Sequence, residues 1–224
     1  MTARIYEIFH SLQGEGIHLG EPTTFVRFAG CNLVCSYCDT PQGREASGAS
    51  EMSLERALNE VSAVTEPGRL VSLTGGEPLL QVEFIRRLAP ELKNRGFRVY
   101  LETNGTLTEG LEKVMEWVDV VAMDIKPPSA CGQDLWLGQR RFLEIARTKV
   151  FVKMVICDNT LPEEVERAAQ MIAEVDKKIV LVLQPAEGAR APELPAVRRL
   201  QARAGERVDH VSIIRQMHKK WNIR

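Results

Sequence analysis

Six short, mostly apolar runs alternate with amphipathic segments along the chain. The runs are rich in β-branched residues and cover residues 23–29, 69–74, 98–103, 118–125, 150–156 and 179–185. Several are apolar almost throughout, which is typical of strands that are buried on both faces of a parallel sheet. The pattern predicts a parallel sheet that is covered by helices.

The segments between these runs carry apolar residues at helical spacing. In the first of them, Ser53 is a plausible N-cap, and Leu54, Leu58 and Val61 share one face. Alternating strands and helices imply right-handed crossovers. A closed eight-stranded barrel needs about 250 residues, so we predict an α/β fold with an incomplete, open parallel barrel of about six βα units. The predicted helices cover residues 52–64, 81–96, 108–117, 161–175 and 193–204.

Composition and charge indicate a single-domain protein and argue against a nucleic-acid-binding or membrane protein. The chain has 224 residues, 44% of them hydrophobic, and no stretch has the composition of a linker, so we expect a single domain over residues 1–224. The net charge is −1 with both signs interspersed, which argues against a nucleic-acid groove. The N-terminus has no apolar signal region, and no apolar run approaches membrane-spanning length. We therefore expect a cytoplasmic protein that binds neither nucleic acid nor a membrane.

Three of the five cysteines, Cys31, Cys35 and Cys38, lie within eight residues. Cytosolic thiols stay reduced, so this spacing indicates a metal site or catalysis rather than disulfides. Structural zinc takes four protein ligands, and a zinc site would need a distant fourth ligand such as His10 or His18. An iron–sulfur cubane held by three cysteines would instead leave one iron open to a chelating molecule. The cysteines alone leave both alternatives open.

The cysteine spacing C-x-x-x-C-x-x-C resembles the signature of the radical S-adenosylmethionine (SAM) enzymes, and "SLTGGEPLL" at residues 72–80 resembles their Gly-Gly-Glu-Pro segment. The resemblance implies a [4Fe-4S] cluster on Cys31, Cys35 and Cys38 whose open iron is chelated by SAM. It implies that an electron from the cluster cleaves SAM to a 5′-deoxyadenosyl radical, which abstracts a hydrogen atom from the substrate.

A finer resemblance covers residues 8–40, "IFHSLQGEGIHLGEPTTFVRFAGCNLVCSYCDT", which are similar to the 7-carboxy-7-deazaguanine synthases along nearly their whole length. The later stretches "ETNGTL", "MDIKPPS", "LQP" and "QMHKKW" also look like that family. The resemblance implies a lyase of queuosine-type base biosynthesis. Such an enzyme converts 6-carboxy-5,6,7,8-tetrahydropterin to 7-carboxy-7-deazaguanine by ring contraction and loss of ammonia. It also implies Mg²⁺ and a flavodoxin- or ferredoxin-type electron donor.

The residue types suit these ligands. Gln13 offers an amide donor and acceptor to a pterin edge, Glu15 can accept from its exocyclic amine, and Arg27 can hold a carboxylate with two parallel bonds. Polar residues at strand ends, Glu102 and Asp124 among them, should meet on one face of the barrel. The resemblance implies substrate contacts at Leu12, Gln13, Gly14, Glu15, Arg27, Thr74 and His218, cofactor contacts at Tyr37, Asp39, Gly75, Gly76, Glu77, Asn104, Lys126, Ser129 and Gln184, and a Mg²⁺ ligand in Thr40.

Two segments and two rival functions complete the expectations. The cluster loop should span residues 30–52, and a C-terminal tail, residues 208–224, should fold over the active site; no general base is evident. One rival is an activating enzyme for glycyl-radical proteins, which shares the cysteine and Gly-Gly-Glu-Pro motifs but would not be expected to carry "SLQGEG" or "CDT". The other rival is a non-catalytic zinc module. Since an open sheet has edges that a second copy can cover, we expect a homodimer.

Overall fold

The computed structural model describes residues 1–44, 48–66 and 68–223. A nine-stranded sheet runs through it in the order β3-β1-β2-β4-β5-β6-β7-β8-β9. β1 pairs antiparallel with both β2 and β3, and every other neighbouring pair is parallel. The strands are β1 Thr2–Leu12, β2 Pro22–Phe28, β3 Ser50–Ser53, β4 Leu70–Gly75, β5 Arg98–Thr103, β6 Val120–Ile125, β7 Val150–Ile156, β8 Leu181–Pro185 and β9 Val211–Ile213.

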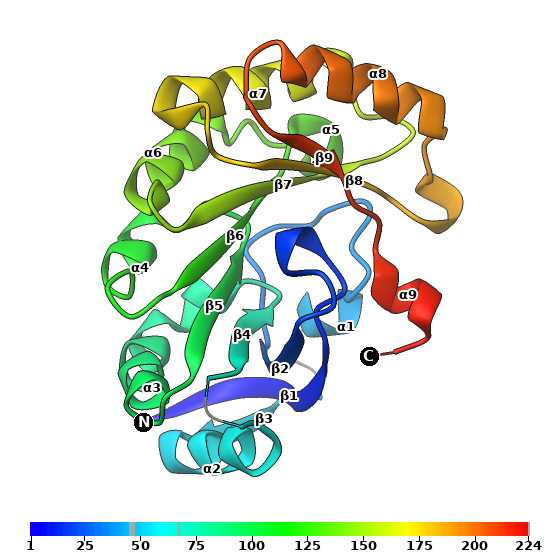
Figure 1. Ribbon diagram of the computed structural model, residues 1–224. Coiled ribbons are helices and arrows are strands. Elements are labelled where there is room, and N and C mark those ends of the chain that lie inside the picture. Colours follow the sequence, from blue (N-terminus) through cyan, green and yellow to red (C-terminus); the bar gives the residue numbers. More distant parts are fainter. Residues whose placement is uncertain (45–47, 67, 224) are drawn as a thin grey trace.

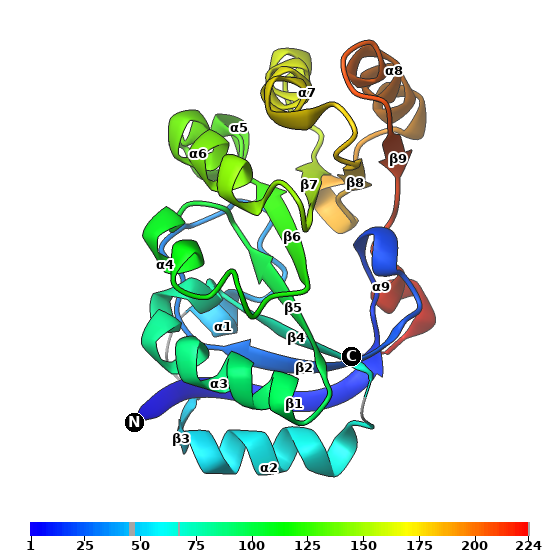
Figure 2. The same cartoon turned by 60° about the vertical axis from the view of Figure 1, so that its left-hand side comes forward.

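Helices α2, α3, α4, α6, α7 and α8 lie along the outer side of the curved sheet, and α9 and the segment after β1 lie on its inner side (Figures 1 and 2). Successive outer helices pack against one another, as α6, α7 and α8 do. The α-helices are α1 Pro41–Arg44, α2 Leu54–Val64, α3 Val82–Asn94, α4 Thr108–Glu112, α5 Pro128–Cys131, α6 Trp136–Ala146, α7 Pro162–Asp176, α8 Leu194–Gly205 and α9 Met217–Trp221, and the 3₁₀ helices are η1 Gly16–His18, η2 Pro78–Gln81 and η3 Gly188–Arg190.

The fold confirms the open parallel barrel. The six predicted strands correspond to β2 and β4 to β8, and the sheet ends at β3 and β9 without closing. Ser53 caps α2, with its hydroxyl accepting a hydrogen bond from the amide of Arg56 at 3.2 Å. The prediction missed β1, β3 and β9, together with α6. β1 is irregular because its pairing with β2 shifts between Ile5 and Glu7, so its side chains do not follow a simple alternation.

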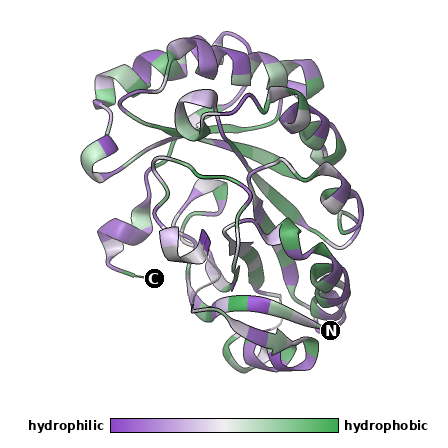
Figure 3. Cartoon of the chain, turned by 180° about the vertical axis from the view of Figure 1, so that it is seen from behind, coloured by the Kyte–Doolittle hydropathy of each residue, from purple (hydrophilic) through white to green (hydrophobic). Residues whose placement is uncertain are grey.

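Side-chain alternation along the strands separates a core from a cavity. In β7, Val152, Met154 and Ile156 point outward into the large apolar core beneath the helices. Phe151 and Lys153 point inward, and the inward residues of neighbouring strands form a smaller cluster around Tyr100 at the base of the barrel. Hydrophobic residues accordingly follow the sheet and the inner helix faces, and hydrophilic residues the outer ones (Figure 3). In the described part of the chain, every helix is too short or too polar to cross a membrane.

Candidate functional site

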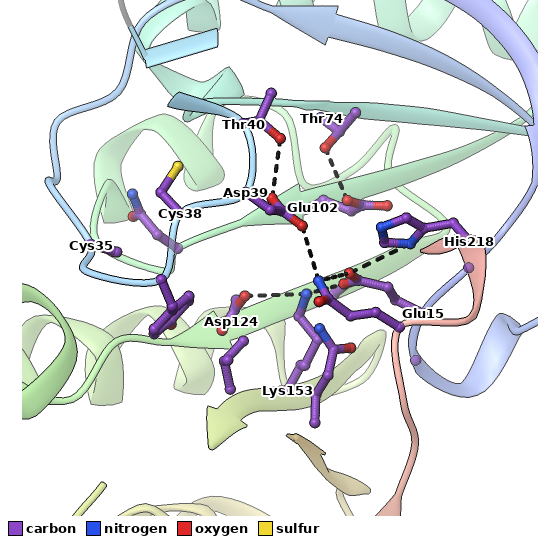
Figure 4. Close-up of a pocket in the computed structure, with 18 of the residues that line it drawn as sticks. Glu15, Cys35, Cys38, Asp39, Thr40, Thr74, Glu102, Asp124, Lys153 and His218 are labelled. Carbon is purple, nitrogen blue, oxygen red and sulfur yellow. Dashed lines mark hydrogen bonds and ion pairs between the residues drawn. The ribbon is translucent and has the colours of Figure 1, made fainter. Parts of the chain in front are cut away.

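A cavity of about 330 Å³ opens at the carboxyl ends of the parallel strands. Its wall comes from the inner face of the barrel, the loop after β1, the loop that carries the cysteines and the C-terminal tail. Figure 4 shows side chains from all four parts pointing toward one another. A volume of this size is sufficient for a small-molecule site.

The three clustered cysteines all line this cavity. Their loop follows β2, and the amide of Ser36 donates to the carbonyl of Ala130 at 2.9 Å, which fixes the loop against α5. Burial raises the pKa of Cys31 and raises that of Cys35 to about 11. These thiols therefore keep their protons at neutral pH unless a metal displaces them.

The segment after β4 fixes the start of the cysteine loop. The amides of Gly76 and Glu77 donate to the carbonyls of Phe28 and Gly30 at 3.2 and 2.8 Å. A Cβ on Gly76 would lie 2.2 Å from the Gly30 oxygen, so only glycine permits this approach. Gly75, with φ of 138°, likewise lies against the backbone of Phe28. The two glycines thus hold Cys31 at the mouth of the barrel.

Glu77 is fully buried behind the cavity wall. Its carboxylate accepts hydrogen bonds from the amide of Asn104 at 2.8 Å and from the hydroxyl of Thr103 at 3.0 Å. Burial raises its pKa to about 7, although these hydrogen bonds and that from Leu79 oppose the rise. Glu77 therefore ties the end of β4 to the end of β5.

Charges of alternating sign cross the cavity floor. Lys153 pairs with Glu15, from the loop after β1, and with Asp124 at 3.2 Å. Asp124 also pairs with Lys126 at 2.8 Å, and the Lys126 ammonium lies 3.1 Å from the hydroxyl of Tyr37 in the cysteine loop. Burial works against both ammonium groups, but the neighbouring carboxylates raise the pKa of each lysine. The row thus joins the loop after β1 to the cysteine loop.

The carboxylate of Glu102, at the end of β5, accepts hydrogen bonds from neutral side chains. It accepts from the Gln13 amide at 2.9 Å and from the hydroxyls of Ser72 and Thr74 at 3.0 and 2.9 Å. Gln13 is 3% exposed, and its side-chain oxygen accepts from the amide of Glu15 at 3.2 Å. The loop after β1 therefore has a defined conformation at the cavity.

Arg27 lines the side of the cavity that is formed by β1 and β2. Its Nε donates to Glu7 at 2.9 Å, and its guanidinium lies 5.8 Å from the centre of the Phe9 ring. Phe9 in turn stacks on Phe25 with 5.0 Å between ring centres. Glu7 and Phe9 thus fix the orientation of the guanidinium through Nε and one ring face. Its two terminal amino groups are suited to bind an anionic ligand.

Two side chains in the wall carry buried polar atoms without a partner among the described residues. They are Asp124, through Oδ1, and Gln184, through both atoms of its amide. Gln184 is fully buried at the end of β8. Because buried polar groups normally find partners, both side chains are suited to a polar ligand in the cavity.

The tail crosses to the loop after β1. The amide of Met217 donates to the carbonyl of Gly14 at 2.9 Å, and a ring nitrogen of His218 lies 4.0 Å from Glu15. Gln216 donates to Glu15 at 2.8 Å and to Asp39 at 3.0 Å. Hydrogen bonding and the charge of Lys153 outweigh burial, and lower the pKa of Glu15 to about 2.

Nearly all residues predicted for the site meet at this cavity. The exceptions are Glu77, which lies behind the wall, and Ser129, whose hydroxyl and amide donate to Glu164 at 2.5 and 2.8 Å. His10 and His18 bond to Thr24 and Glu21 and do not line the cavity. The predicted residues that do line it are Leu12, Gln13, Gly14, Glu15, Arg27, Cys31, Cys35, Tyr37, Cys38, Asp39, Thr40, Thr74, Gly75, Gly76, Asn104, Lys126, Gln184 and His218.

The sequence-based prediction missed Lys153 and Gln216. A signal for Lys153 is present, because it is the one charged residue within the apolar run 150–156 and falls on the same face as Phe151. No local signal identifies Gln216, since Glu15 and Asp39, which accept hydrogen bonds from its amide, lie near the other end of the chain. Part of the cluster loop, residues 45–47, and tail residue 224 lie outside the described residues.

Comparisons with known proteins agree with one another. The sequence profile of the radical SAM superfamily matches residues 25–130. The chain is 39% identical to the 7-carboxy-7-deazaguanine synthase of Geobacter sulfurreducens over 97% of this chain and 96% of that one. It is 37% identical to the enzyme of that name from Archaeoglobus fulgidus over the whole of both chains. Among solved structures, QueE from Escherichia coli aligns with a TM-score of 0.66 at 22% identity, covering 95% of this chain and 94% of that one.

Proposed function

The chain belongs to the 7-carboxy-7-deazaguanine synthase family of radical SAM enzymes, and from this premise we propose that it converts 6-carboxy-5,6,7,8-tetrahydropterin to 7-carboxy-7-deazaguanine. It is a lyase of 7-deazapurine biosynthesis that uses a [4Fe-4S] cluster and SAM and acts on a small molecule. One observation carries the proposal for the substrate. The cysteine loop and the polar loop Gln13–Gly14–Glu15 line the same cavity.

The residues present suit a cluster and its cofactor. Cys31, Cys35 and Cys38 offer three thiols on one loop, and the described residues that line the cavity with them include no fourth cysteine. When bound, the cluster and SAM together supply a 5′-deoxyadenosyl radical for hydrogen abstraction. The Gln184 amide, which has no partner in the described part of the chain, and the polar atoms of Asn104 and Lys126 are suited to the polar groups of SAM.

The opposite side of the cavity suits a carboxylated pterin. Gln13 and Glu15 present an amide and a carboxylate to a heterocycle edge, and Thr74 and His218 complete the polar rim. Arg27 would hold the substrate carboxylate through its terminal amino groups. The apolar base of the barrel, with Tyr100 and Phe151 among its residues, would exclude water from a reacting carbon held against it. These residues bind and orient; none is assigned as a general base.

The proposal includes Mg²⁺, with the Thr40 hydroxyl as its protein ligand. The Thr40 hydroxyl lies in the cavity and donates to Asp39 at 3.1 Å, so a hard oxygen is available beside the cysteine loop. A Mg²⁺ ion there would reach the substrate carboxylate with few protein bonds.

Further expectations concern the whole protein. We propose that residues 1–224 act as one domain in the cytoplasm, and that a flavodoxin- or ferredoxin-type protein supplies the electron. The terminal strands β3 and β9 leave two sheet edges, and we propose a homodimer that covers such an edge.

Anaerobic turnover tests the proposed function. Reconstituted protein, reductant, SAM and 6-carboxy-5,6,7,8-tetrahydropterin should yield 7-carboxy-7-deazaguanine and ammonia, and omission of Mg²⁺ should slow the reaction. Cleavage of SAM without any deazapurine would reject the pterin substrate and retain the radical chemistry. A glycyl radical on a partner protein, formed in place of the deazapurine, would favour the activating-enzyme alternative.

A further inference from the structure

Gln216 connects three segments that are far apart in the sequence. Its side-chain amide donates one hydrogen bond to Glu15 at 2.8 Å and one to Asp39 at 3.0 Å. Its carbonyl oxygen accepts from the ammonium of Lys219 at 2.6 Å. Both N–H groups and the oxygen of one amide are therefore engaged, by the loop after β1, the cysteine loop and the tail itself.

The contacts of this amide are shielded from water. Gln216 is 8% exposed, although it lies in a tail whose helix α9 has no buried residue. From Gln216 onward the tail meets the cavity through polar contacts, whereas Ile214, just before it, packs against the small apolar cluster around Tyr100. The polar contacts include the 2.9 Å hydrogen bond from Met217 to Gly14 and the 3.5 Å ion pair between Lys219 and Asp39.

The fit between the tail and the loop after β1 is close. A Cβ added to Gly14 would lie 2.7 Å from the side chain of His218, so the two backbones could not approach in this way with any other residue at position 14. Removal of the tail would leave Glu15 with Lys153 as its remaining strong partner. It would also release Asp39, which directly follows Cys38, from the Gln216 amide.

A cation site is a competing explanation for the side chains that meet around Gln216. Ligand atoms of Glu15, Asp39 and His218 lie within 4.8 Å of one another. The Gln216 amide, however, already donates to both carboxylates, and a cation would have to displace it. A neutral donor thus satisfies this pair of acidic groups.

We propose that Gln216 is a positioning residue that couples the loop at residues 13–16 to the cysteine loop at residues 36–40, so that the substrate side and the cofactor side of the cavity close together. The proposal deepens the proposed function and rests on it for the identity of the two ligands. Its structural part, the coupling of the two loops, does not depend on that identity. Opening of the tail would loosen both loops at once and admit the ligands.

Hydrogen–deuterium exchange of the cluster-free protein tests the coupling directly. Gln216→Met keeps the side-chain length and removes the donors, and Gln216→Glu replaces them with a charge that repels Glu15 and Asp39. Lys220→Gln is the matched control, because Lys220 is exposed in α9, the helix that begins directly after Gln216. In both Gln216 variants, we expect the backbone amides of residues 13–16 and 36–40 to exchange at least about tenfold faster than in the wild type. Loss of one hydrogen bond worth about 1.4 kcal/mol corresponds to this factor.

The control should leave both loops unchanged, and the amides of β7 should exchange equally in all proteins and thereby report an intact fold. Faster exchange in the tail alone, or in only one loop, would overturn the proposal. If Mg²⁺ alone slowed the exchange of both loops in Gln216→Met, the proposal would also be overturned. The group of Glu15, Asp39 and His218 would then be a cation site.

Turnover adds a second readout. In Gln216→Met, more 5′-deoxyadenosine should form per molecule of deazapurine, because the cofactor side no longer closes with the substrate side. An unchanged ratio, with a raised KM alone, would reduce Gln216 to a substrate contact and contradict the coupling. If the wild-type protein makes no deazapurine, the proposed function fails, and the exchange experiment still decides whether the loops are coupled.

Discussion

Lys153→Met tests whether the charges on the cavity floor are arranged as described. Lys153 lies between Glu15 and Asp124, and its side chain is 14% exposed. Methionine fills a similar volume without the charge. The substitution removes the lysine partner of Glu15 and leaves Asp124 with Lys126 alone at 2.8 Å. Removing one partner of a buried ion pair typically costs about 3–5 kcal/mol.

The pKa of Glu15 sets the pH dependence. Burial works against its ionisation, but the charge and hydrogen bond of Lys153, with the hydrogen bond of Gln216, lower the pKa from 4.5 to about 2. A shift of that size is worth about 3 kcal/mol. Because the folded-state pKa lies below the unfolded value, this stabilisation is present above about pH 4.5 and is lost as the pH falls toward 2. In the variant, the pKa of Glu15 should rise, so the loss of stability is greatest at neutral pH.

Urea unfolding of the cluster-free protein, followed by circular dichroism at pH 7 and pH 4, measures both effects. Lys113→Met is the matched control, since Lys113 pairs with Glu83 at 2.9 Å and both side chains are about half exposed. We expect the control to lose less than about 1 kcal/mol. We expect Lys153→Met to lose about 3 kcal/mol or more at pH 7 and clearly less at pH 4. Equal losses at both pH values, or a loss no larger than that of the control, would refute the reasoning.

Three further substitutions test separate parts of the cavity. Gly76→Ala should reduce the iron bound per chain after reconstitution several-fold, because its Cβ would lie 2.2 Å from the Gly30 oxygen. In the control Gly138→Ala the new Cβ meets nothing within 4 Å, so this variant should bind iron normally. Equal iron contents in the two variants would contradict the packing described for Gly76. Thr40→Val should abolish the stimulation of turnover by Mg²⁺ and spare SAM binding; a retained Mg²⁺ response would remove Thr40 as the ligand. Arg27→Lys should raise the KM for the pterin about tenfold or more through loss of bidentate binding, and an unchanged KM would show that Arg27 does not hold the carboxylate.

The strands could be predicted where both faces are buried. The predicted segments 98–103 and 150–156 match β5 and β7 to the residue, because apolar runs bounded by polar residues leave little freedom in their limits. β1 and β3 form an antiparallel edge, and β9 has only three residues. Half-exposed edge strands give a weak pattern, and tertiary pairing decides whether they form.

The residues of the candidate site likewise differ in how far the sequence predicts them. Residues in local motifs, such as Cys31 and Gly76, could be predicted because their chemistry is carried by adjacent positions. Lys153 required knowledge of which face of β7 points inward. Gln216 was out of reach, because 201 residues separate it from Glu15 along the chain, and their contact depends on the tail crossing the open side of the barrel.

The proposed function requires an iron–sulfur cluster that three cysteines hold and whose remaining iron binds SAM. Electron paramagnetic resonance of the reduced, reconstituted protein, recorded with and without SAM, tests it most directly. We predict about four irons per chain, the signal of a reduced [4Fe-4S] cluster, and a change in that signal when SAM is added. A spectrum that SAM leaves unchanged, or a protein that takes up zinc in place of iron, would contradict the claim.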